Sequence, residues 1–160
     1  IYLAKIETKY WIEYICKRFE NTGKHISPEL AEEICRLVDN HSSYVQQLSW
    51  LLWIRTINTA TTEQLSYALE DLLDQNNILF QSETENLSAY QMNFLKAIVD
   101  GIHTKFSSKE VISKYNLGTS ANIVRLKNAL LQKELIETNG KEIVLADPVF
   151  GVWFKKEMLY

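Results

Sequence analysis

The segment from Ser120 to Lys133 carries the side chains best suited to reading a nucleic acid. Asn122, Arg125 and Asn128 point outward on a helical pattern whose inward stripe is apolar. Arginine pairs bidentately with guanine and asparagine with adenine, while lysines suit phosphates. One interpretation is therefore a helix in the major groove of DNA, and the alternative is an ordinary solvated helix surface. The candidate face for nucleic acid or a protein partner comprises Ser120, Asn122, Arg125, Lys127, Asn128, Lys133 and Lys141.

Charge supports this face only weakly. Residues 1–106 hold nine Lys and Arg against fourteen Asp and Glu, whereas residues 107–160 hold eight against six. Dedicated DNA-binding domains are usually far more basic. Lys141 also stands beside Glu137 and Glu142, which disfavours tight phosphate contact.

No set of residues predicts catalysis. The three histidines lack metal-ligand spacing, and the carboxylate clusters Glu32-Glu33 and Glu70–Asp74 are typical of solvated helix faces. The motifs GxxxxGK[ST], GxGxxG and HExxH are absent from the sequence. We therefore expect no catalytic residue, no metal site and no cofactor in this chain, which is not an enzyme as it stands.

The sequence on both sides of Ser120–Lys133 predicts the fold that positions this helix, a winged helix-turn-helix. A short helix, a glycine-containing turn and a second amphipathic helix are followed by two strands, with Asn139-Gly140 between them as a strong hairpin signal. The expected elements are the helices Lys109–Tyr115 and Ser120–Lys133, the turn Asn116-Leu117-Gly118, and the strands Leu135–Thr138 and Glu142–Ala146.

The first half of the chain predicts four amphipathic helices. Apolar residues recur at helical spacing from Ile6. A second helix begins at Ser27-Pro28-Glu29, where Ser27 is the N-cap, Pro28 takes the first helical position and Glu29 is favourable near the positive end of the helix dipole. A third helix begins near Ser42, and a fourth at Thr61-Thr62-Glu63, weakened at Asn76-Asn77. Short connections between such helices indicate a small bundle.

A polar stretch, Ser82–Asn86, reads as a linker or a helix end. Ser88 with Gln91 forms a capping box that starts the next helix, and Asp147-Pro148 starts a closing one. We thus predict a mainly α fold with two domains: a helical bundle over residues 1–86 and a winged helix over 87–160.

Aromatic residues on two helices have two interpretations. Trp50, Trp53, Phe150, Trp153 and Phe154 are more typical of a core than of a ligand site. Some of them are alternatively exposed where another domain packs.

Bulk properties exclude several classes of protein. The chain has 160 residues, 46% of them hydrophobic and 23% charged, as in soluble globular proteins. The longest apolar run is too short for a membrane, and the two isolated cysteines favour a reducing cytoplasm. Ile1 is no start methionine and leads directly into a helical pattern, so we expect a piece of a longer chain.

Four phrases in this order resemble a family of bacterial and archaeal ATPases of the AAA type, similar to the signal-transduction (STAND) class. They are HSSYVQQL at 41–48, YNLGTSA at 115–121, ALLQKELI at 129–136 and DPVFGVWF at 147–154. The resemblance implies a helical lid followed by a winged helix, with the P-loop domain upstream. It also implies ATP and Mg²⁺ as cofactors of the full-length parent, and it places His41 and Tyr44 nearest the nucleotide. Ser42-Ser43 stands where the family has a proline.

Two hypotheses follow. The first is a non-catalytic lid and winged helix of a cytoplasmic P-loop ATPase, which couples nucleotide state to binding of DNA or a protein and contacts the upstream ATPase domain. The second is a winged-helix transcription regulator whose N-terminal helical bundle dimerises or binds an effector.

Overall fold

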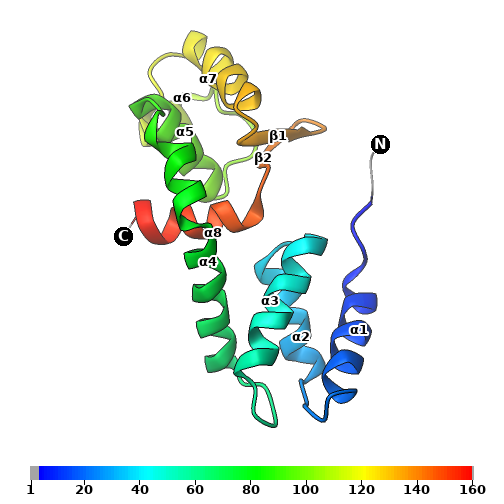
Figure 1. Ribbon diagram of the computed structural model, residues 1–160. Coiled ribbons are helices and arrows are strands. Elements are labelled where there is room, and N and C mark those ends of the chain that lie inside the picture. Colours follow the sequence, from blue (N-terminus) through cyan, green and yellow to red (C-terminus); the bar gives the residue numbers. More distant parts are fainter. Residues whose placement is uncertain (1–3, 160) are drawn as a thin grey trace. The chain divides into compact units, whose positions relative to one another are not determined.

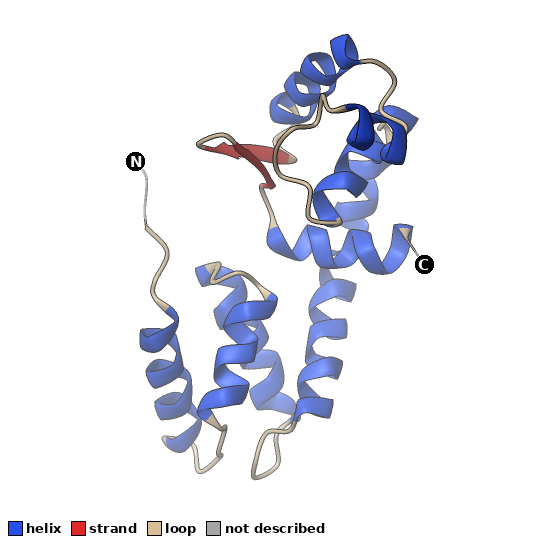
Figure 2. Cartoon of the chain, turned by 180° about the vertical axis from the view of Figure 1, so that it is seen from behind, coloured by secondary structure: helices blue, strands red, loops and turns tan. Residues whose placement is uncertain are grey.

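The computed structural model describes residues 4–159 (Figure 1). The chain folds into two compact units, the first ending at Asn76 and the second beginning at Asn77. The described chain is mostly helical with one two-stranded sheet (Figure 2). The predicted fold class, mainly α with a winged helix-turn-helix and a small hairpin, is confirmed. No helix among these residues combines the length and the apolarity that crossing a membrane requires.

The first unit contains α1 (Thr8–Glu20), α2 (Pro28–Leu37), α3 (Ser42–Arg55) and the beginning of α4 (Thr62–Glu85). The predicted start of α2 is confirmed, because the Ser27 hydroxyl accepts a hydrogen bond from Leu30 N at 3.1 Å and Pro28 takes the first position. α2 packs against both α1 and α3. Helical spacing was expected from Ile6, and α1 begins two residues later, at Thr8.

Two loops of the first unit are joined by backbone hydrogen bonds. His25 N donates to Asn58 O, and Ala60 N donates to His25 O, both at 2.8 Å. These bonds form an isolated parallel bridge between His25 and Thr59. The turn after α1 and the turn after α3 are therefore fixed to each other.

α4 is longer than expected and runs without a break through Asn76-Asn77. The Asn76 side chain donates to Leu72 O of the same helix at 2.8 Å, and the Asn77 side chain accepts from the Trp153 indole at 2.8 Å. Both amides thus have partners compatible with a helix. Of the segment Ser82–Asn86, the residues up to Glu85 are helical. The expected domain boundary after residue 86 stays a prediction, and the two compact units meet ten residues earlier, at Asn76 and Asn77.

In the second unit, four helices and two strands follow the end of α4, and the predicted capping box is confirmed. Ser88 Oγ accepts from Gln91 N at 3.1 Å, while the Gln91 side chain accepts from Ser88 N at 3.0 Å. The elements are α5 (Ala89–Val99), α6 (Lys109–Tyr115), α7 (Ser120–Gln132), the hairpin β1 (Ile136–Asn139) and β2 (Glu142–Leu145), and α8 (Pro148–Met158).

An aromatic cluster forms the centre of the second unit. Phe80 of α4 makes an edge contact with Phe150 of α8 and a tilted contact with Trp153, at ring distances of 5.4 and 5.6 Å. Phe94 of α5 stacks on Phe106 at 4.6 Å. The expectation that Phe150, Trp153 and Phe154 belong to the core is confirmed, since each is only 1% exposed.

Glu83 of α4 makes one pH-dependent contribution to stability. Burial, and secondarily the nearby charge of Asp147, raises its pKa above the ordinary value of 4.5. A carboxyl whose pKa is raised by folding destabilises the fold when ionised, so stability falls as pH rises through the folded-state pKa. Glu83→Gln should therefore unfold at higher urea concentration than wild type at pH 7.

This gain should shrink on acidification and vanish only well below pH 4.5, the ordinary pKa, where Glu83 is protonated in both the folded and the unfolded state. Glu85→Gln, at an exposed position of the same helix, is the matched control. It should show no gain in urea resistance that depends on pH. A gain from Glu83→Gln that persisted unchanged at low pH would contradict this explanation.

Candidate functional site

The helix-turn-helix turn between α6 and α7 is held by one side chain from α5 and one from α7. Asn116 ends α6 in the left-handed conformation (φ 52°), and Asn93 of α5 donates to its carbonyl at 3.1 Å. Gly118 follows with φ +88°, and the Asn122 amide donates to Leu117 O at 3.1 Å. These contacts fix the direction in which α7 leaves the turn.

α7 presents the amphipathic pattern expected of it. Ile123, Leu126 and Leu130 are buried, whereas Arg125 and Asn128 are exposed. The helix contains no acidic residue. Arg125 and Asn128 therefore form the exposed polar centre of this face.

The other members of the candidate face differ in how available they are. Ser120 and Lys133 are exposed at the two ends of α7, and Lys127 is half-buried. Asn122 is also half-buried and its amide donates into the turn, so it positions the helix instead of pointing outward as expected. Lys141 is exposed on the wing.

The wing is joined to the loop before α6 in a way that the sequence did not indicate. Ile143 N donates to His103 O at 2.8 Å, and His103 Nδ1 lies 3.0 Å from Ile143 O. A carbonyl only accepts, so Nδ1 carries the hydrogen. The wing itself presents Glu137 and Glu142 together with Lys141, all exposed.

The structure brings His41 and Tyr44 together at the start of α3. Their rings lie 4.7 Å apart, and His41 is the N-cap residue but makes no side-chain cap bond. His41 Nδ1 is buried and has no hydrogen-bond partner within residues 4–159.

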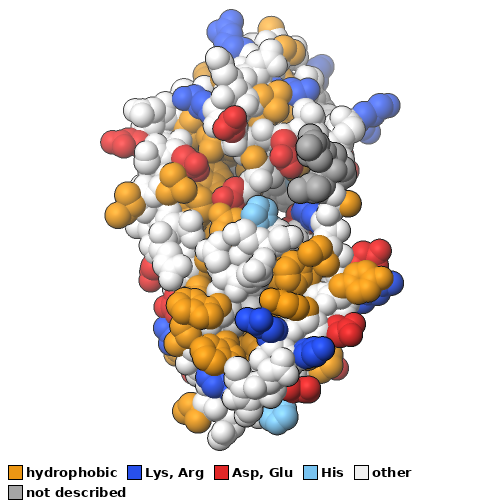
Figure 3. Space-filling model, turned by 45° about the vertical axis from the view of Figure 1, so that its right-hand side comes forward, with side chains coloured by type: hydrophobic (Ala, Val, Ile, Leu, Met, Phe, Trp, Pro, Cys, Tyr) orange, Lys and Arg blue, Asp and Glu red, His pale blue; other side chains and the backbone are white. Residues whose placement is uncertain are grey.

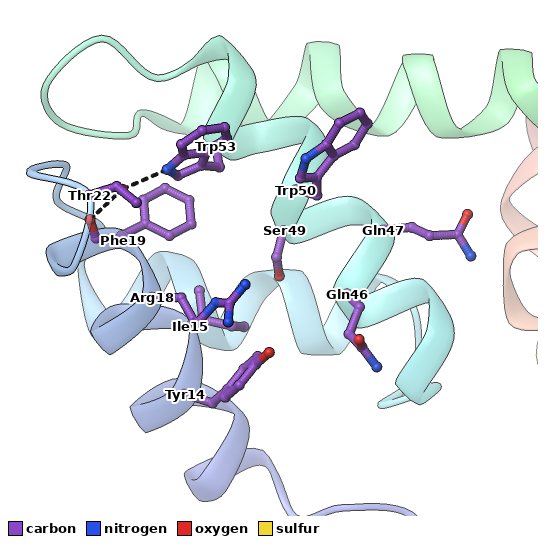
Figure 4. A pocket seen from close by; sticks show the side chains of 10 residues that line it. All are labelled: Tyr14, Ile15, Arg18, Phe19, Thr22, Gln46, Gln47, Ser49, Trp50 and Trp53. Carbon is purple, nitrogen blue, oxygen red and sulfur yellow. Dashed lines mark hydrogen bonds between the residues drawn. The ribbon is translucent and has the colours of Figure 1, made fainter.

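A groove between α1 and α3 was not anticipated. We call it the α1–α3 groove; its cavity of about 560 Å³ is lined by aromatic side chains of both helices, with one arginine and one unpaired glutamine among them (Figure 4). Trp53 is held there by its indole, which donates to Thr22 Oγ1 at 2.8 Å. The lining residues that matter below are Tyr14, Arg18, Phe19, Gln46, Trp50 and Trp53.

The prediction that Trp50 lies in the core is wrong, since 58% of this side chain is exposed. α3 buries Leu48 and Leu52 against the unit and leaves Trp50 on the opposite side. Figure 3 shows hydrophobic side chains gathered around basic ones on the part of the surface that α1 and α3 present. Exposure of Trp50 agrees with the alternative interpretation, a surface on which another protein segment packs.

Neither cysteine is reactive. Burial raises the pKa of the Cys35 thiol to about 11 and also raises that of Cys16. Both remain protonated thiols at neutral pH, and the thiolate is the reactive form. Within residues 4–159, no three His, Cys, Asp or Glu side chains come together as metal ligands.

Comparisons with known proteins agree with this architecture. Residues 78–156 match the family described as "Probable winged helix domain". The Walker-type ATPase Paby2304 of Pyrococcus abyssi has a similar structure, with a TM-score of 0.69 and 18% identity over 94% of this chain and 42% of that chain. No curated protein matches. At this identity the likeness shows a shared fold, and this chain spans less than half the length of that ATPase.

Proposed function

We propose that the chain is the lid and winged-helix region of a P-loop ATPase, without catalytic activity of its own, and that it couples nucleotide state to the binding of a partner. The observation that carries the proposal is the likeness to a Walker-type ATPase over nearly the whole chain. More than half of that ATPase lies outside the match, and this chain lacks the GxxxxGK[ST] motif. ATP and Mg²⁺ would be held by a P-loop domain elsewhere in the parent protein.

His41 and Tyr44 are the residues we assign to the nucleotide side of the lid. The ring of Tyr44, whose centre lies 4.7 Å from that of His41, offers a stacking surface for a base. The N-terminus of α3 carries the positive end of the helix dipole, which favours negative charge nearby. ATP would thereby bind one lid arrangement better than another, and a ligand can shift an equilibrium only through such a difference in affinity.

The test is carried out on the complete coding region that contains this chain. We expect an upstream GxxxxGK[ST] motif, ATP hydrolysis by the full-length protein and none by the 160-residue chain alone. Tyr44→Ala should raise the KM for ATP several-fold, whereas Tyr67→Ala, at an exposed position on α4, should not. A reading frame that starts directly before Ile1 would refute the proposal.

DNA binding through α7 is the second candidate function, in which the chain serves as a winged-helix regulator. The observation in its favour is an exposed Arg125 and Asn128 on a helix without acidic residues. The acidic residues of the wing weigh against it, because they would repel phosphates at the edge of the contact.

If this function holds, Arg125→Ala should weaken binding to duplex DNA by about 1–3 kcal/mol at low salt. The lost side chain is the only arginine on the face. Fluorescence anisotropy across a salt series measures both affinity and salt dependence. Lys155→Ala, which removes an exposed cation from α8, is the control and should bind DNA like wild type. The absence of any duplex binding by the wild-type chain at low salt would exclude this function.

A further inference from the structure

Two rows of side chains, spaced four residues apart, border the α1–α3 groove. Side chains at this spacing lie on one face of a helix, and each row covers about 12 Å of helix axis. The apolar members are strongly exposed, with Trp50 at 58% and Ile54 at 50%. The rows are Tyr10, Tyr14 and Arg18 on α1, and Gln46, Trp50 and Ile54 on α3. Tyr10 and Ile54, at one end of each row, do not line the cavity itself.

Three polar side chains at the groove, those of Tyr14, Arg18 and Gln46, have no hydrogen-bond acceptor among the described residues. The other polar lining residues, Thr22, Gln47, Ser49 and Trp53, each donate to a neighbouring residue. The Arg18 guanidinium lies 5.7 Å from the centre of the Tyr14 ring, and no described residue supplies it with a carboxylate. The Tyr14 hydroxyl and the Gln46 amide also lack hydrogen bonds to other residues in the range 4–159. Figure 4 shows Tyr14 and Arg18 extending from α1 toward the side of the groove formed by α3.

The charge of the groove is opposite to that of the unit around it. Residues 1–76 contain eleven Asp and Glu against seven Lys and Arg. Arg18 is nevertheless the single charged residue among those lining the groove, and the acidic residues of α1, Glu13 and Glu20, are not among them. A ligand that carries a carboxylate is therefore complementary to this site.

The extent of the apolar surface favours a protein segment over a small molecule. The cavity of about 560 Å³ would accommodate a small ligand. Such a ligand would leave the ends of both rows uncovered, where Tyr10 is 56% and Ile54 50% exposed. An amphipathic helix covers a groove of this length with apolar residues at i and i+4.

We propose that the α1–α3 groove binds an acidic amphipathic helix of a protein partner. Apolar side chains of that helix enter between Tyr14 and Trp50, and a glutamate or aspartate next to them accepts hydrogen bonds from Arg18. This contact is formed wholly within the first unit and does not involve the face of α7.

The test uses the 160-residue chain and three labelled synthetic helices. Each peptide has leucines at i and i+4, and these are flanked by glutamate in the first, glutamine in the second and lysine in the third. Fluorescence anisotropy should show the glutamate peptide binding about tenfold more tightly than the lysine peptide. The glutamine peptide should lie between them, because it keeps the apolar contacts and loses the charge.

Variants of the chain identify the residues responsible. Arg18→Glu should reverse the preference, so that the lysine peptide binds more tightly than the glutamate peptide. Trp50→Ala should weaken both peptides by about tenfold, because it removes one wall of the groove. Lys17→Glu makes the same charge change on the neighbouring residue, which does not line the groove, and should leave binding unchanged. Circular dichroism checks that each variant is folded.

Several results would overturn the proposal. Equal binding of the three peptides, or equal effects of Arg18→Glu and Lys17→Glu, would show that Arg18 does not select a carboxylate. A wild-type dimer in sedimentation that dissociates on Arg18→Glu and excludes the peptides would assign the groove to a second copy of the chain. Binding of free indole-3-acetate as tight as that of the glutamate peptide would assign it to a small acid.

Discussion

Trp153→Ala is expected to lower the free energy of unfolding of the second unit by about 3–5 kcal/mol. The side chain is 1% exposed and lies against Phe80 and Phe150, so truncation leaves a cavity bordered by rings that cannot fill it. The change also removes the hydrogen bond to Asn77, whose amide oxygen then loses its donor. No other single replacement proposed here should cost as much.

Urea unfolding followed by circular dichroism measures this loss. Trp50→Ala is the matched control, because it removes the same side chain from a position where 58% of it is exposed. Exposed side chains away from special features change stability by about 0.5 kcal/mol or less. Similar midpoints for the two variants would contradict the packing described for α8.

Gly118→Ala is expected to destabilise the second unit by about 2–3 kcal/mol, from two separate causes. An alanine at φ +88° is strained by its own Cβ. That Cβ would also lie 3.1 Å from Nδ2 of Asn122, the group that donates to Leu117 O. The substitution therefore disturbs the bond that sets the direction of α7.

Gly140→Ala separates these causes. Gly140 also has a positive φ, of +64°, but nothing lies within 4 Å of the position of its Cβ. It should show the backbone strain alone, about 1–2 kcal/mol, in the same urea experiment. Equal losses for the two glycine variants would mean that the contact with Asn122 contributes nothing.

Local signals were enough to predict most of the fold. The starts of α2, α5 and α8 follow from a capping residue with a proline or glutamine at a fixed offset, and these interactions span only two or three residues. The Asn139-Gly140 turn likewise fixes the hairpin, whose strands lie within one residue of the expected bounds. Each of these features depends on neighbours in the sequence.

Features that depend on distant partners were not predictable in the same way. Asn77 reads as a helix breaker until Trp153, far along the chain, supplies its indole donor. Trp50 looks like a core residue because α3 is apolar on several faces, and its packing against α2 contributes to deciding which face is covered. Asn122 has the right spacing for an outward face, yet its amide is used by the turn.

The pairing of His103 with Ile143 has a consequence for self-association of the hairpin. Thr138 and Ile143 oppose each other as a non-hydrogen-bonded pair, so the amide and carbonyl of Ile143 point away from β1. Unpaired groups on a strand edge are a template on which a strand of another molecule can add. His103 occupies both groups of Ile143, one through its backbone and one through its ring. At its central outward position β2 is therefore closed to strand addition, and a small exposed hairpin is protected from becoming the start of an aggregate.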